Sequence, residues 1–193
     1  YEGSNKLGKS RKARWLPTWN VSTAWNAHEE EFWQPIRDVV SNMTLKASYS
    51  LTADRGPASV SNSKAIINSY NTWRPFTSVK ESGLILSNVE NSELTYEKKH
   101  ELNIGAEIGF IDNRINVEAD WYKRNNFDLI GLIYTKGTGG QLAKFANVAS
   151  MKSSGVELTV STHNIKTQDF SWNTDFIFSH AKNEVTDLQS NAS

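Results

Sequence analysis

The feature that most constrains this chain is a strict alternation of apolar and polar side chains over unusually long runs. In residues 19–26, Trp19, Val21, Thr23 and Trp25 alternate with Asn, Ser and Ala. A period of two places alternate side chains on opposite faces of a β-strand. The pattern recurs in 43–51, 101–110, 115–124, 153–162 and 169–180, with Ile177 as the one misfit. The sequence therefore predicts an all-β fold with six strands, each apolar on one face and polar on the other.

The lengths of these runs and of their connections indicate a transmembrane barrel. Most runs hold about 9–11 residues, the length that crosses a bilayer at a tilt, whereas strands of soluble proteins average about 5–6. The connections 111–114 and 163–168 are short, but 52–99 and 127–150 are long and rich in Ser, Asn, Gly and charge. Short turns at one end and long loops at the other are typical of outer-membrane barrels. We therefore expect an antiparallel segment of such a barrel.

This asymmetry also predicts an orientation, with the short turns facing the periplasm. Strands 19–26, 101–110 and 153–162 would run toward the periplasm, and the other three would run away from it. The connection 27–42 is longer than the other turns at that end, and we expect one helical turn in it near Glu29–Trp33. The periplasmic interface, where aromatic girdles form, would then hold Trp25, Phe32, Trp33 and Phe110.

Composition narrows the classes of site that the chain can carry. Its 21 basic and 21 acidic residues give a formal net charge of zero, so nothing indicates binding to nucleic acid. The absence of cysteine excludes disulfides, thiol nucleophiles and zinc sites with cysteine ligands. No run of about 20 apolar residues occurs, so no transmembrane helix is expected. A transmembrane barrel remains compatible with this composition, because its strands are apolar on one face only.

We predict no catalytic, cofactor-binding or metal site in this chain. The cluster from His28 to Glu31 lacks the HExxH spacing of a zinc site, and the Gly-rich stretch 137–140 lacks the GK[ST] ending of a phosphate loop. The other histidines, at 100, 163 and 180, stand alone in the sequence. A barrel is expected to carry acids on its inner face, in contact with water or a plug. We assign to that face Glu101, Glu107, Glu118, Asp120 and Glu157.

Six segments, in order along the chain, resemble the SusC/RagA family of TonB-dependent receptors. Residues 15–32, with Trp15-Leu16-Pro17-Thr18-Trp19, Ala24-Trp25 and Glu30-Glu31-Phe32, resemble the FPS…AW…EEPF segment of that family. The others are Glu2–Ser4 (family DGSS), Leu45–Tyr49 (LKLRASYG), Leu94–Gly105 (LTWEK…ELNIG), Arg114–Tyr122 (RINLSVDYY), and Asn147 with Ser153–Leu158 (N…NKGVEL). The chain departs from the family pattern at Thr18, Ser50 and Ser154, and none of these departures disturbs the alternation.

This resemblance implies more than the alternation does. Family members are plugged barrels of about 22 strands in the outer membrane of Gram-negative bacteria. They import large nutrients such as glycans or peptides, with energy from the TonB system and with a SusD-like surface lipoprotein as a lid. Residues 1–193 would then be part of the barrel domain, about six strands of its wall. The plug domain, the remaining strands and the region that contacts TonB would lie outside this chain, and outer-membrane lipid would surround it.

Aromatic and basic side chains in the predicted extracellular loops are candidate contacts to a substrate or a lid. Exposed aromatic rings can stack on sugars or pack against a protein partner. They could equally pack the loops on themselves. The candidates are Tyr70, Trp73, Arg74, Phe76 and Tyr134.

A soluble all-β carbohydrate-binding module is the alternative. Six strands with aromatic-rich loops could form a sandwich, in which the apolar faces of two sheets share one core. A barrel would instead present the same apolar faces to lipid. The two classes therefore differ in what covers the apolar side of the strands.

Overall fold

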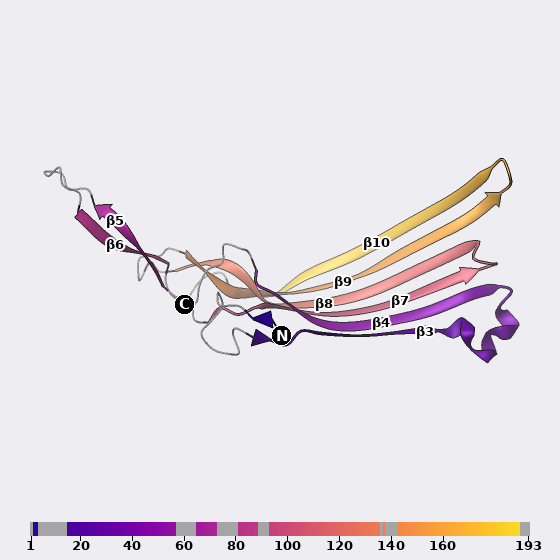
Figure 1. Ribbon diagram of the computed structural model, residues 1–193, viewed down its shortest axis with the longest axis horizontal. Helices are drawn as coiled ribbons and strands as arrows, with labels where there is room; N and C mark the ends of the chain where they lie inside the picture. Colours follow the sequence, from indigo (N-terminus) through magenta and orange to yellow (C-terminus); the bar gives the residue numbers. More distant parts are fainter. Residues whose placement is uncertain are drawn as a thin grey trace.

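Six antiparallel strands form one long, curved sheet in the computed structural model (Figure 1). The structure describes residues 2–3, 15–56, 65–72, 81–88, 93–135, 137 and 143–189. Neighbours across the sheet follow the order β10-β9-β8-β7-β4-β3. Its strands are β3 (Trp19–Asn26), β4 (Val40–Asp54), β7 (Glu97–Phe110), β8 (Ile115–Tyr134), β9 (Ala143–Lys166) and β10 (Ser171–Leu188). The six predicted strands and the all-β fold are therefore confirmed.

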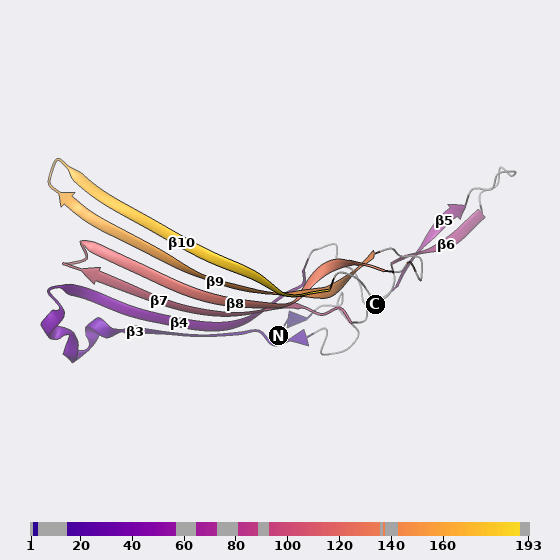
Figure 2. The same cartoon turned by 180° about the vertical axis from the view of Figure 1, so that it is seen from behind.

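The connections β3–β4, β7–β8 and β9–β10 gather at one end of the sheet, which we call the turn end (Figures 1 and 2). Two 3-10 helices, η1 (Ala27–Glu29) and η2 (Glu31–Ile36), join β3 to β4 and confirm the helical turn predicted there. Between β7 and β8, φ is positive at Ile111 (50°), Asp112 (52°) and Asn113 (60°). Asp and Asn tolerate this conformation well, which explains why the chain reverses at this point.

β8 and β9 continue further away from the turn end than the alternation in the sequence predicts. The predicted loop 127–150 is wrong, because β8 continues to Tyr134 and β9 begins at Ala143, so only 135–142 separates the two strands. The predicted turn 163–168 also shifts, because β9 runs to Lys166 and the reversal occupies 167–170. A register shift between Asn126 and Leu129 interrupts the β8–β9 ladder, and Asp128 there has a φ of 59°. This irregularity breaks the alternation on which the sequence prediction relied.

The predicted loop 52–99 contains a hairpin that the sequence does not reveal. Its strands, β5 (Ile66–Thr72) and β6 (Glu81–Asn88), form a separate two-stranded sheet beyond the end of the main sheet opposite the turns (Figures 1 and 2). β4 and β7 remain direct neighbours on either side of it, from Val40 paired with Phe110 to Asp54 paired with Glu97. A third, very short sheet pairs β1 (Glu2–Gly3) with β2 (Trp15–Leu16).

The main sheet buries few of its large apolar side chains in the described part of the chain. The fully buried pair, Leu94 and Tyr96, precedes β7 and packs with Leu16, Ala53, Ile130 and Phe145. By contrast, Trp25, Ile104 and Phe178 expose 46%, 48% and 48% of their surface. No helix among the described residues is long and apolar enough to cross a membrane.

Candidate functional site: the two faces of the sheet

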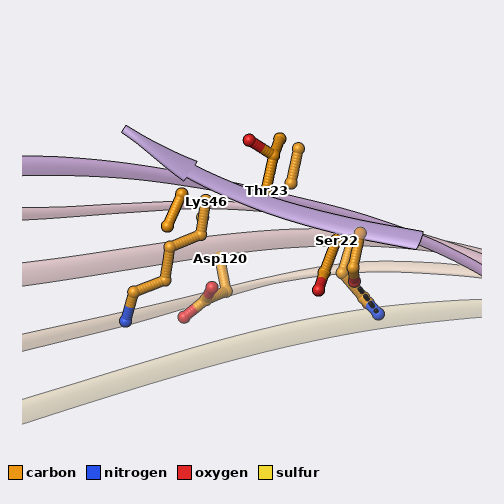
Figure 3. Close-up of a pocket in the computed structure, with 9 residues that line it drawn as sticks. Ser22, Thr23, Lys46 and Asp120 are labelled. Carbon is orange, nitrogen blue, oxygen red and sulfur yellow. Dashed lines mark hydrogen bonds between the residues drawn. The ribbon is translucent and has the colours of Figure 1, made fainter. Parts of the chain in front are cut away.

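The main sheet has one polar and one apolar face. In Figure 3, Ser22, Lys46 and Asp120 project to one side of the sheet, whereas Thr23 projects to the other. The register extends this division across all six strands. One polar row contains Ala24, Lys46, Gly105, Asp120, Glu157 and Ser179, and the next apolar row contains Trp25, Leu45, Ala106, Ala119, Leu158 and Phe178. In these two rows the predicted alternation therefore holds on all six strands.

An uncharged area runs across the apolar face, and we call it the apolar belt. It comprises alternate residues from Trp19 to Trp25 on β3, Met43 to Leu51 on β4, Leu102 to Phe110 on β7, Ile115 to Trp121 on β8, Val156 to Val160 on β9 and Trp172 to Phe178 on β10. None of these side chains is charged. A lipid-facing surface requires this, because a charge at mid-bilayer costs about 2–4 kcal/mol.

The edges of the apolar belt slant relative to the cross-strand register. At the edge far from the turns, Leu51 pairs with His100, Leu102 with Lys123, and Val156 with His180. The belt therefore moves toward the turn end as it passes from β4 to β10. Its other edge moves in the same direction, from Trp25 on β3 through Met43 on β4 to Phe110 on β7.

A barrel in a bilayer explains this slant. Barrel strands tilt by about 35–45° relative to the barrel axis and lie about 4.8 Å apart. The boundary of a flat lipid layer therefore shifts along each successive strand by about 3–5 Å, or roughly one residue. The belt edges move at about this rate. In a sandwich of aligned sheets, nothing would require both edges of the apolar belt to shift in the same direction from strand to strand.

Aromatic side chains border the apolar belt at the turn end. Trp25 and Phe32 have ring centroids 6.4 Å apart, and Phe32 and Trp33 have centroids 6.3 Å apart. The indole of Trp25 donates to Glu30 Oε1 at 3.1 Å, and the indole of Trp33 donates to the Val40 carbonyl at 2.9 Å. The sequence predicted Trp25, Phe32 and Trp33 together at this end, and the structure groups them.

A second row of rings, which the sequence does not reveal, meets the opposite edge of the belt on β3 and β4 and lies beyond that edge on β7 and β8. Ring centroids lie 5.3 Å apart for Trp19 and Tyr49, 6.1 Å for Tyr49 and His100, and 5.8 Å for His100 and Phe127. The row crosses β3, β4, β7 and β8. Its members are far apart in sequence, so only the register brings them together. On β3, Trp25 and Trp19 lie at the two edges of the belt, where membrane barrels carry their aromatic girdles.

The polar face is held by ion pairs and by one aromatic contact. Lys46 forms a hydrogen-bonded ion pair with Glu107. Glu101 lies 3.0 Å from Lys99 Nζ and 3.1 Å from Arg124 Nε, and the Arg124 guanidinium lies 4.3 Å from the centre of the Tyr122 ring. The acids predicted for the inner face do share one face in the register.

Glycine is required on the polar face at Gly155, which lies opposite Tyr122. A Cβ at this position would lie 2.6 Å from the Tyr122 hydroxyl and 2.7 Å from the His180 carbonyl oxygen. The missing side chain therefore leaves room for the Tyr122 ring over the backbone of β9.

Asn147 joins three segments at the end of the sheet far from the turns. Its Nδ2 donates to the carbonyls of Thr95, at 2.9 Å, and Asp128, at 2.6 Å, and its Oδ1 accepts from the Thr95 amide at 2.9 Å. The side chain thus acts as an extra strand partner for the segment that carries Leu94 and Tyr96. It also bridges the irregularity in β8, where Lys98 Nζ lies 2.6 Å from Asp128 Oδ2.

Replacing Asn147 with Ala should loosen this junction in the full-length protein. The variant removes three hydrogen bonds to partly buried backbone groups, so we expect local opening to cost about 1–3 kcal/mol less. Trypsin cleavage after Lys98 and Lys99 should then be about 5–150-fold faster. Asn164→Ala is the matched control. Asn164 is exposed, and its Nδ2 donates a hydrogen bond to Thr174 Oγ1, another exposed side chain. Equal cleavage rates in both variants would contradict a role for Asn147 in holding the segment.

The structure describes two of the five candidate contact residues. Tyr70, on β5, and Tyr134, at the end of β8, are 57% and 66% exposed. The other candidates, Trp73, Arg74 and Phe76, lie outside the described residues. Tyr70 and Tyr134 therefore remain candidates for contacting a substrate or a lid. Among the described residues, no group of three or more His, Asp or Glu side chains could hold a metal ion.

Comparison with known proteins identifies the family of the chain. The family model "TonB dependent receptor-like, beta-barrel" matches residues 1–192. TonB-dependent receptor P3 of Formosa agariphila is 26% identical over 97% of the chain, and TonB-dependent receptor SusC of Bacteroides thetaiotaomicron is 25% identical over 97%. The chain spans only 18% and 19% of the length of these curated relatives.

A solved structure shows the same fold. The RagAB peptide importer in its closed-closed state superposes with a TM-score of 0.81 at 23% identity, covering 96% of this chain and 20% of the other. The match confirms that six strands of this length and order occur as part of a larger barrel. Together with the family model, it confirms the resemblance derived from the sequence motifs. The chain belongs to the TonB dependent receptor-like β-barrel family.

Proposed function

We propose that this chain forms part of the wall of an outer-membrane receptor that imports large nutrients in a Gram-negative bacterium. The slanted, uncharged apolar belt, with aromatic rings at its turn-end edge, carries the proposal. Such a belt fits a tilted barrel wall in lipid. The polar face would then line the lumen, with Glu118, Asp120 and Glu157 toward water or a plug. The wall would take part by position and polarity, without covalent chemistry.

The proposed substrates are oligosaccharides or peptides, and the proposed partners are a SusD-like surface lipoprotein and the TonB system. The motif resemblance supports both partners. The similarity of the fold to RagAB, a peptide importer, supports peptides as one substrate class. Exposed Tyr70 and Tyr134 are suited to stack on sugars or to pack against a lid.

The soluble carbohydrate-binding module is less well supported. A sandwich needs a second layer over the apolar face. Among the described residues, none of the large apolar side chains of the apolar belt is buried, and β5 and β6 lie beyond the end of the sheet (Figure 2).

Growth on defined carbon and nitrogen sources tests the import proposal. We expect deletion of the full-length gene to abolish growth on one class of oligosaccharide or peptide and to leave growth on its monomers unchanged. A plasmid copy should restore growth, and a protonophore should block uptake by the restored strain. Unchanged uptake of every oligomer by the deletion strain would contradict the proposal.

The proposed orientation predicts which sites are accessible from outside the cell. A cysteine at Ser82, on β6, should react with an impermeant thiol reagent on intact cells. A cysteine at Asp169, in the β9–β10 turn, should react only after the outer membrane is opened. The native segment contains no cysteine that would compete. Labelling of the Asp169 site alone on intact cells would reverse the orientation.

A further inference from the structure

Three lysines form a compact basic group on the apolar face, just beyond the apolar belt. Lys123 on β8 pairs with Ser154 on β9, which pairs with Lys182 on β10. Lys152 lies two residues from Ser154 on the same strand, so it projects from the same face. All three lysines are exposed. We call Lys123, Lys152 and Lys182 the lysine triad.

The spacing of the lysine triad suits one tetrahedral anion. Strands lie about 4.8 Å apart, so the Cα atoms of Lys123 and Lys182 are about 10 Å apart, and Lys152 lies diagonally about 8 Å from each. A lysine side chain extends over four methylene groups, so three such stems can bring their ammonium groups to a common point. That point would lie above Ser154, whose hydroxyl can also donate a hydrogen bond.

The lysine triad keeps most of its charge available. Lys182 Nζ lies 3.9 Å from Glu184, and both side chains are more than 60% exposed. Neither Lys123 nor Lys152 forms an ion pair with another residue that the structure describes. Asp187 lies further from the belt on β10, beyond a register shift. Glu184 also pairs with Lys152 in the register, so three lysines against one carboxylate leave a formal net charge of +2. The next row on the belt side, Trp121, Val156 and His180, contains no carboxylate.

Its position selects the kind of anion. The row next to the triad on the belt side contains Trp121 and Val156, and Phe178 lies one row further on. A ligand bound here would meet ammonium groups at one end and an apolar surface at the other. A free phosphate uses only the first part of this surface, whereas a lipid uses both.

We propose that the lysine triad binds the phosphorylated headgroup of a glycolipid in the outer leaflet of the membrane. The acyl chains cover the adjoining apolar belt while the phosphate lies among the three ammonium groups. This inference rests on the proposed outer-membrane location. It adds a lipid site that the import proposal does not require.

Lipid binding by the purified full-length receptor tests the lysine triad. We expect the triple variant Lys123→Gln, Lys152→Gln, Lys182→Gln to bind lipopolysaccharide in non-ionic detergent roughly 10–100-fold more weakly than the native receptor, because each lysine near an anionic lipid contributes to affinity. The matched Lys→Arg triple variant should retain binding. A control that removes three charges at the turn end, Arg37→Gln, Arg114→Gln and Lys166→Gln, should bind as the native receptor does.

Three results would overturn the lipid site. The first is that the Lys→Gln variant binds lipopolysaccharide as tightly as the native receptor. The second is that the native receptor binds enzymatically dephosphorylated lipopolysaccharide as tightly as the intact lipid. The third is that millimolar inorganic phosphate displaces the lipid fully, which would assign the triad to a free anion. Outer-membrane fractionation and heat-modifiability of each variant are measured first. These two measurements test the proposed location and folding, so their failure is distinguishable from failure of the lipid site.

Discussion

Ile104→Arg should block assembly of the full-length barrel. Ile104 lies within the apolar belt, between Ala47 on β4 and Trp121 on β8, and it is 48% exposed. An Arg on the lipid face at mid-bilayer costs about 2–4 kcal/mol, a large share of the stability of an ordinary domain. Heat-modifiability on gels, which separates folded from unfolded barrel, should show little or no folded species.

The neighbouring variant Asn103→Arg is the control for this prediction. Asn103 projects from the polar face, where its Nδ2 donates to Glu101 Oε1 at 3.1 Å. An Arg there would meet water and the Glu101 carboxylate, so most of the protein should still fold. If Asn103→Arg were the more damaging change, the polar face would be the one in contact with lipid.

The 193 residues expressed alone should aggregate or remain unfolded in detergent-free buffer. β3 and β10 are the edges of the sheet, and unpaired edges promote association between strands. Trp19, Trp25 and Phe176, 42%, 46% and 56% exposed, belong to an apolar surface that continues across all six strands. Contiguous apolar patches above a few hundred Å² are rare on soluble monomers. Six strands are also fewer than the eight of the smallest membrane barrels.

Analytical ultracentrifugation and near-UV circular dichroism would test this expectation. Aggregates, or a chain without fixed aromatic signals, would agree with a barrel wall separated from its neighbours. A monodisperse monomer that melts cooperatively in plain buffer would instead favour the soluble carbohydrate-binding module. Adding detergent distinguishes the two further, because only a membrane segment should depend on it.

The sequence predicted the strands where one face of the sheet is apolar and the other polar. Trp19–Asn26 has the same bounds in the structure as in the prediction. The period of two is readable there because the two faces differ in polarity along the whole run. The short connection 111–114 was also predicted, and Asp112 and Asn113 within it are residue types that tolerate the positive φ found there.

The far ends of the strands escaped prediction because both of their faces are polar or mixed. Beyond Trp121, β8 carries Lys123, Arg124 and Asn125 on alternate faces, so no contrast in polarity marks the strand. The hairpin of β5 and β6 was missed for the same reason. The row of rings from Trp19 to Phe127 depends on register between four strands, which no local pattern contains.

The candidate site was less predictable than the fold. Tyr70 and Tyr134 were chosen because aromatic residues in long loops often bind ligands. Tyr134 turned out to end a long strand, and the structure does not bring it together with Tyr70 in any described contact. The lysine triad was not predicted, because Lys123, Lys152 and Lys182 come from three strands. Only the register, in which Lys123 and Lys182 both pair with Ser154, brings them near one another.

The direct pairing of Asp54 with Glu97 has a consequence for how such a protein can diversify. The β5–β6 hairpin lies between these two residues in sequence, and the hydrogen-bond ladder between β4 and β7 does not depend on its length. The segment after it, with Leu94 and Tyr96, packs against the sheet. Doubling the length of a flexible loop adds only about 0.6 kcal/mol of closure entropy. Mutations that lengthen, shorten or exchange this hairpin therefore meet little resistance from the wall. Natural selection can then change the end of the molecule far from the turns while the strands of the main sheet stay the same.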